Sequence, residues 1–192
     1  MTPADQELIA KVKLGDKQAF TELYDLYAER ILNYLYRYIG DYHAAKDLTI
    51  ETFLKAHNNL KEYKEQGLFS SWLYKIATNC AKNELRTRFR RREVPIEELD
   101  LSGMAVRESE RPDKEAETHE FNEFIGKAIS KLGKKYREVL LLCDVDGLKY
   151  EEAADILQCN IKTIGTRVRR ARKMFCDILK KHGYKGASDE NS

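Results

Sequence analysis

The residues best suited to chemistry are basic side chains gathered in one segment of the C-terminal half. Six lysines and arginines, and no acid, lie between Lys162 and Lys173. A short helical pattern over 150–157 and a turn over 158–160 precede them, and Asn160 is a favourable residue to cap the next helix. Two helices joined by such a turn are typical of a helix-turn-helix, whose second helix fits the major groove of DNA. The pattern predicts DNA binding, and the alternative is a solvated basic face.

A second basic cluster lies in the N-terminal half. Residues 71–92 hold seven bases and one acid. The amides of Asn79 and Asn83 lie between the bases, and Phe69 and Trp72 lie near the start of the segment. Bases along a helix can follow a phosphate backbone, while amides and aromatic rings read or stack on unpaired bases. The segment therefore predicts a surface for nucleic acid, although each aromatic ring taken singly also fits a place in the core.

Residues of the kind that build catalytic or metal sites are scattered. Neighbouring ligand pairs such as Cys-x-x-Cys are absent from the sequence, and so is a glycine-rich phosphate loop. The histidines and cysteines are His43, His57, His119, His182, Cys80, Cys143, Cys159 and Cys176. We therefore expect no enzymatic activity, no metal, no cofactor and no small-molecule substrate.

The composition is that of a folded protein with segregated charge. The 192 residues are 42% hydrophobic and 34% charged, and the net charge is only +2. The longest apolar run, Val139 to Cys143, is far shorter than the ~20 residues that a bilayer requires. The N-terminus has no apolar stretch typical of a secretion signal. These observations predict a cytoplasmic protein with no membrane insertion and with reduced thiols.

Helical periodicity runs through most of the chain and positions both basic segments. Apolar residues recur every three or four positions between Asp16, a potential cap, and Gly40, a potential stop. Further helices are expected over about 42–60, from a cap at Ser70 or Ser71, over 150–157 and after Asn160. Residues 93–120 interrupt the pattern with ten acids and three bases. The predicted fold is all-α, with two small helical domains joined by an acidic flexible linker.

The expected division of the chain follows from these patterns. An N-terminal helical domain covers 1–92, the linker covers 93–112, and a helix-turn-helix bundle covers 113–182, followed by a frayed tail over 183–192.

The order and spacing of several stretches resemble bacterial RNA polymerase sigma factors of the extracytoplasmic-function class. In the first domain these are GDKQAFTELYDLY, AAKDLTIETFLKAHNNL and FSSWLYKIATNCAKNELR. In the second domain the matching stretch is KKYREVLLLCDVDGLKYEEAADILQCNIKTIGTRVRRAR. The resemblance implies a protein that binds core RNA polymerase and directs initiation by recognising two promoter elements and helping to melt DNA.

The resemblance implies a role for the AAKDLTIETF helix in docking on core polymerase. The implied docking residues are Asp47, Leu48, Ile50, Glu51 and Phe53. Four of them match the family pattern Asp-Leu-x-Gln-Glu-x-Phe, and Ile50 replaces its glutamine.

The two basic segments would then contact the two promoter elements. For the downstream element the implied residues are Phe69, Trp72, Lys75, Asn79, Lys82, Asn83 and Arg86. For the upstream element they are Lys162, Thr163, Thr166, Arg167 and Arg170. Gly165 replaces the usual lysine or arginine of the family, which predicts an altered upstream preference.

Family resemblance also implies an anti-sigma factor as a partner. The acidic linker would imitate nucleic acid, and its charge suggests that it covers the basic domains in the free protein; a plain solvated spacer is the alternative. The competing function is a dimeric helix-turn-helix repressor or activator, which would bind intact duplex without polymerase.

Overall fold

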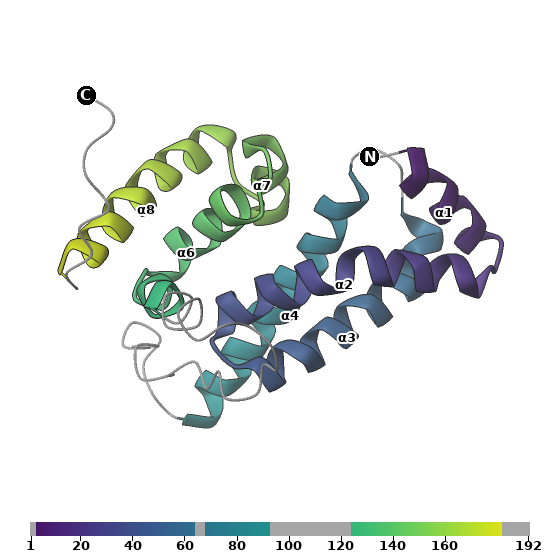
Figure 1. Cartoon of the computed structure of the whole chain (residues 1–192), viewed down its shortest axis with the longest axis horizontal. Helices are drawn as coiled ribbons and strands as arrows, with labels where there is room; N and C mark the ends of the chain where they lie inside the picture. The colour runs from purple at the N-terminus through teal and green to yellow at the C-terminus, as the bar shows by residue number, and fades with distance from the viewer. Residues whose placement is uncertain (1–2, 64–67, 93–123, 182–192) are drawn as a thin grey trace.

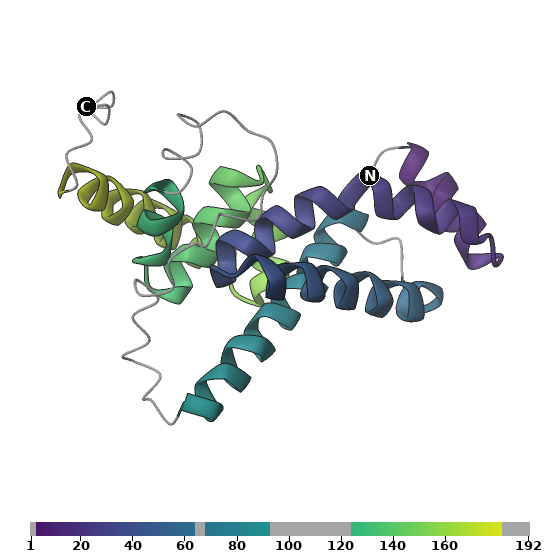
Figure 2. The same ribbon diagram turned by 60° about the horizontal axis from the view of Figure 1, so that its bottom comes forward.

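The computed structural model describes residues 3–63, 68–92 and 124–181, and the predicted linker and tail lie outside them. Every regular element among the described residues is helical, as the periodicity predicts. Figures 1 and 2 show α1 to α4 on one side of the molecule and α6 to α8 on the other.

The N-terminal half is built on the long helix α2 (Lys17–Ile39). Asp16 caps it by accepting hydrogen bonds from the backbone N–H groups of Gln18 and Ala19, at 2.8 and 3.1 Å. Gly40 ends it with a φ of 74°, a left-handed conformation that favours glycine. Both predicted ends of this helix are therefore confirmed.

Three further helices pack around α2. They are α1 (Pro3–Lys13), α3 (Tyr42–Asn59) and α4 (Phe69–Arg92), and a short 3-10 turn, η1 (Leu60–Glu62), follows α3. The prediction that Ser70 or Ser71 caps α4 is wrong, because the helix already begins at Phe69. The Leu68 carbonyl already accepts the Trp72 backbone N–H at 3.2 Å, so helical hydrogen bonding starts before either serine. The Phe69 ring is buried against Tyr27 and Tyr63.

The C-terminal half contains the predicted helix-turn-helix. Residues 124–130 are helical and are followed by α6 (Lys134–Leu140), a π-turn η4 (Leu141–Val145), α7 (Tyr150–Leu157) and α8 (Ile161–Lys181). Gly147, with a φ of 71°, stands between η4 and α7. The bounds of α7 are those that the sequence predicts.

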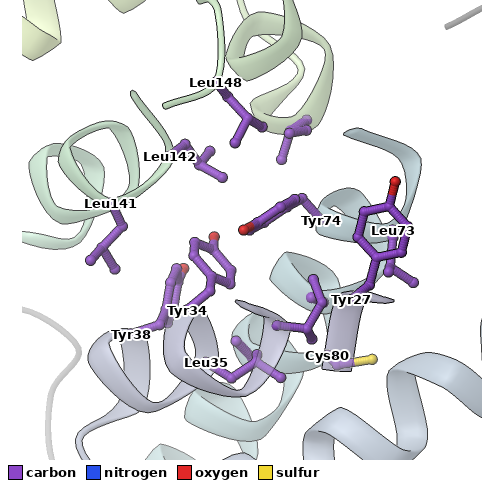
Figure 3. Packing of buried hydrophobic residues seen from close by; sticks show 14 of the residues in the cluster. Tyr27, Tyr34, Leu35, Tyr38, Leu73, Tyr74, Cys80, Leu141, Leu142 and Leu148 are labelled. Carbon is purple, nitrogen blue, oxygen red and sulfur yellow. The ribbon is translucent and has the colours of Figure 1, made fainter. Parts of the chain in front are cut away.

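The two halves share one apolar core. Helix α4 packs against α7, and α2 contacts η4. Figure 3 shows the rings of Tyr34, Tyr38 and Tyr74 facing Leu141 and Leu142 across the boundary. All five side chains are buried, so the halves meet through an apolar junction and not only through the chain that links them.

Candidate functional site

Helix α8 presents its basic side chains on the surface of the helix-turn-helix. The Oδ1 of Asn160 accepts a hydrogen bond from the Lys162 backbone N–H at 2.8 Å, which confirms the predicted cap. Ile164 and Val168 are buried and anchor the helix on the C-terminal core. Among the predicted upstream-element residues, Lys162, Thr166 and Arg170 are exposed, while Thr163 and Arg167 are half-buried. The helix thus offers a positive surface of the width that a major groove admits.

Gly165 lies on α8 beside the ring of Tyr150, the first residue of α7. A Cβ atom built at Gly165 would lie 3.7 Å from that ring, which is an ordinary van der Waals contact. The close approach of α7 and α8 therefore does not require glycine at this position. The Tyr150 residue beside it is 36% exposed.

Arg172 has a structural role that the sequence did not indicate. Its Nε and Nη2 atoms donate hydrogen bonds to the two carboxylate oxygens of Asp144, at 2.9 and 2.6 Å. This bidentate pair ties α8 to η4 and raises the pKa of Arg172 above its usual range. The arginine is 28 residues from its partner in sequence, and no local pattern connects them.

On α4, the predicted downstream-element residues form one stripe. Trp72, Lys75, Asn79, Lys82 and Arg86 recur at steps of three and four, which places them along one side of the helix. Asn79, Asn83 and Arg86 are exposed, and Trp72, Lys75 and Lys82 are partly so. The stripe combines positive charge, amides and one accessible aromatic ring.

Phe69 lies outside this stripe and inside the core. Its side chain is 1% exposed, and its ring is 5.7 Å from the Trp72 ring, centroid to centroid. The Tyr63 ring is 4.9 Å from the Trp72 ring on the same criterion. Phe69 and Tyr63 therefore support the partly exposed indole.

Arg88 is likewise engaged within the protein. Its guanidinium contacts Glu84 at 2.6 Å and Asp41 at 3.1 Å. Because Asp41 also caps α3 through the Ala44 backbone N–H, this arginine joins the start of α3 to the basic end of α4.

The predicted docking residues of α3 divide into a buried and an exposed set. Leu48 and Phe53 are buried, whereas Asp47 and Ile50 are exposed. Glu51 is half-buried and pairs with Lys55 at 2.6 Å, and this carboxylate raises the pKa of the lysine. Leu48 and Phe53 thus hold α3 in place, while the exposed residues face outward.

Leu54 is an exposed residue of this surface that sequence reasoning missed. It follows Ile50 by one helical turn, and the two side chains are 60% and 52% exposed. An exposed leucine has no special signal in a helical pattern, since single apolar residues are common at protein surfaces. Only its proximity to Ile50 makes the pair a distinct apolar patch.

The described part of the chain contains no group of three or more His, Cys, Asp or Glu side chains able to hold a metal ion. Within the same residues, no helix has the length and apolarity needed to cross a membrane. Cys80, Cys143, Cys159 and Cys176 all carry free thiols.

Comparison with known families matches both halves. The model of sigma-70 region 2 matches residues 23–91, and the model of sigma-70 region 4 matches residues 125–175. The chain is 34% identical over 180 residues to the RNA polymerase sigma-H factor of Pseudomonas aeruginosa, covering 91% of this chain and 93% of that protein. It is 33% identical over 178 residues to the ECF RNA polymerase sigma-E factor of Escherichia coli K12, covering 88% and 91%.

Solved structures show the same fold. The sigma factor RpoE of Bartonella quintana, in complex with the anti-sigma factor NepR, superposes with a TM-score of 0.67 at 25% identity, covering 84% of this chain and 96% of that one. CnrH, in complex with the cytosolic domain of CnrY, gives a TM-score of 0.72 at 21% identity and covers 93% and 99%.

The matches of both helical halves to sigma-70 regions thus define a transcription initiation factor. The chain belongs to the sigma-70 family, in the extracytoplasmic-function class of RNA polymerase sigma factors. As a sigma factor it acts with core RNA polymerase on promoter DNA and is not favoured as a free-standing repressor or activator.

Proposed function

We propose that the three surfaces divide the work of initiation. The exposed face of α3, with Asp47, Ile50, Glu51 and Leu54, docks on core polymerase. The stripe on α4 binds and opens the downstream promoter element, and α8 reads the upstream element. The N-terminal domain over 1–92 and the C-terminal domain over 113–182 act as the two DNA readers, separated by the linker over 93–112.

The observation that supports this assignment best is the stripe on α4. The exposed amide of Asn83 accepts a hydrogen bond from Arg86 at 3.5 Å, and the exposed Asn79 lies one turn before Asn83. Trp72 lies two turns before Asn79 along the same side. Stacking on an aromatic ring contributes about 1–3 kcal/mol per base, whereas opening DNA costs about 1.4 kcal/mol per base step. Captured bases can therefore offset much of the cost of local melting.

On α8, the exposed Lys162, Thr166 and Arg170 are proposed to reach base edges or phosphates. A bidentate arginine–guanine contact is worth about 1–3 kcal/mol of discrimination. The half-buried Thr163 and Arg167 flank this surface. The direct role in initiation is binding and not catalysis.

An anti-sigma factor is proposed as a further partner, supported by the similarity to the sigma factor that is solved with NepR. A cytoplasmic location is proposed because the work of a sigma factor is with the polymerase on chromosomal DNA.

The test is transcription from a randomised promoter library with purified core polymerase, with and without this protein. Start sites that require the protein and share two spaced sequence elements are the expected result. Alanine variants of Asn79 and Arg170 should then relax the preference at the downstream and upstream element, respectively. Loss of activity that is uniform over all promoters would contradict base recognition by these side chains.

A further inference from the structure

Two consecutive residues of α6 hold one residue of α2 across the junction between the halves. The Arg137 Nη1 atom donates a hydrogen bond to the Tyr38 carbonyl at 3.1 Å, and the Tyr38 hydroxyl donates one to Glu138 Oε1. Burial and the Glu138 carboxylate raise the pKa of Tyr38, so its hydroxyl keeps the proton that it donates. Arg137 and Glu138 are 5% and 6% exposed, so both contacts are shielded from water.

Glu138 also contacts the DNA-binding stripe itself. Its Oε1 atom lies 3.6 Å from the Nζ of Lys82, a residue of the stripe on α4. Lys134 and Arg86 contribute further positive charge nearby, and burial together with Lys82 and Arg86 lowers the pKa of Lys134. Lys82 of α4 and Lys134 of α6 therefore both act on this one carboxylate, from the two halves of the molecule.

A second polar contact joins α4 to the C-terminal half at Ser71, one turn before Lys75. The Ser71 hydroxyl donates a hydrogen bond to Glu152 Oε1 at 2.7 Å, and the other oxygen of Glu152 accepts the Lys149 backbone N–H at the start of α7. The helix-turn-helix half therefore lies against the side of α4 that borders Trp72 and Lys75, and α4 packs on α7 there.

Resting on the function proposed above, we propose that the free protein is self-inhibited by its C-terminal half, with Glu138 taking the place of a DNA phosphate at Lys82. We call the contacts among Tyr38, Lys82, Arg137 and Glu138 the clasp. A phosphate that approaches Lys82 in the closed molecule meets the negative charge of Glu138. Promoter binding therefore requires the clasp to open, and opening exposes Lys82 to the DNA.

The clasp differs in kind from the role considered for the acidic linker. The linker was expected to cover the basic surfaces through diffuse charge, whereas the clasp consists of specific contacts between folded helices. Deleting part of the linker should therefore leave the clasp closed.

The first experiment detects the closed state in the full chain by carbodiimide cross-linking, which joins a carboxylate to a neighbouring amine as an amide with loss of water. Mass spectrometry of the free protein should show a Lys82–Glu138 link, and this link should disappear in the complex with core polymerase and promoter DNA. The Glu7–Lys11 pair on α1, 2.7 Å apart, is the internal control and should be linked in both samples. Absence of the Lys82–Glu138 link from the free protein, or its persistence in the promoter complex, would overturn the proposal.

The second experiment measures the affinity of the free protein for a labelled promoter fork by fluorescence anisotropy. Glu138→Gln keeps an oxygen that accepts from Tyr38 but removes the charge. The apparent affinity for DNA is the intrinsic affinity multiplied by the fraction of molecules that are open. Releasing the clasp should therefore raise the apparent affinity about tenfold or more. Glu29→Gln removes the same charge from an exposed site on α2 and serves as the matched control. Equal affinities of the two variants would overturn the proposal.

Tyr38→Phe provides an independent route to the open state. It deletes only the hydroxyl that donates to Glu138, and circular dichroism checks that the fold is kept. The free variant should gain affinity for the fork and lose Lys82–Glu138 cross-linking; wild-type values for both would contradict the clasp. Transcription by the holoenzyme tests the proposed DNA-binding surfaces, because their failure would appear there as unchanged promoter specificity in the surface variants. Cross-linking tests the clasp separately, because it reports the Lys82–Glu138 contact regardless of the DNA sequence.

Discussion

At the scale of single residues, the apolar pair Ile50 and Leu54 is the feature of the proposed docking surface with the clearest consequence. Both side chains lie on the same side of α3 and are more than half exposed. Covering them with a partner would release water from both, which favours binding. The surface thus combines an apolar patch with the acid Asp47, which is exposed a turn earlier.

Leu54→Lys should weaken binding to core polymerase about tenfold, because it places a charge in the apolar patch. Leu14→Lys, at a side chain that is 89% exposed after α1, is the matched control and should bind as the wild type does. Titration of labelled protein with core polymerase measures both. Unchanged affinity of the Leu54 variant would remove this residue from the docking surface.

Gly165→Ala should raise the free energy of unfolding by about 1 kcal/mol. Alanine is more favourable than glycine in a helix interior by about that amount, and its methyl group fits beside Tyr150 at an ordinary contact distance. Urea unfolding monitored by circular dichroism gives the difference. A loss of stability would show that the α7–α8 contact cannot accept the added methyl group.

At the scale of elements, Arg137 links three helical segments. It donates to the carbonyls of Ile129 and Ser130 at the end of the helix over 124–130, to that of Leu132 just after it, and to that of Tyr38 near the end of α2. A positive charge is favourable at the carboxyl end of a helix. This single side chain therefore serves two helix ends from different halves.

Arg137→Ala should lower the free energy of unfolding by about 2–4 kcal/mol, because it removes the charged donor that the carbonyls of Tyr38, Ser130 and Leu132 share within the buried junction. Arg172→Ala, which breaks an exposed pair with Asp144, should cost much less, about 0.5–1 kcal/mol. Chemical denaturation of both variants tests the difference. Similar losses would mean that the buried carbonyls find other donors.

The sequence predicts the helices well and the junction poorly. Asp16, Gly40 and Asn160 act locally, within a turn of the residues that they cap, so their roles can be read from neighbouring residues. Tyr38 and Glu138 are 100 positions apart, and nothing in either pattern indicates the other. Likewise, a helical period does not distinguish Phe69, which is buried, from Trp72, which is partly exposed, because both are aromatic and near one helix start.

At the scale of the whole molecule, Asp146 makes the stability of the fold sensitive to pH. Burial raises the pKa of this carboxyl to about 6, while Tyr74, Arg30 and Arg37 are the titratable and charged groups that face it. In the folded protein this carboxyl therefore binds its proton more tightly than in the unfolded chain. The stabilisation linked to this proton is present at low pH and is lost as the pH rises through about 6.

The difference in free energy of unfolding between wild type and Asp146→Asn should therefore depend on pH. The variant has no titratable group at position 146. Relative to it, the wild type should gain stability as the pH falls from 7.5 to 5. Urea unfolding at a series of pH values measures the difference, and the histidines cancel because both proteins share them. A difference that stays constant over this range would contradict the raised pKa.

Trp72 is the only tryptophan in the chain, and it lies on the stripe that we assign to opened DNA. Its indole is partly exposed and rests on Tyr63 and Phe69. Excitation at the red edge of the protein's absorption selects tryptophan over tyrosine, so the emission comes from Trp72 alone. A base that stacks on the ring would quench that emission, so this sigma factor carries its own optical reporter of strand capture, usable in real time and without a dye.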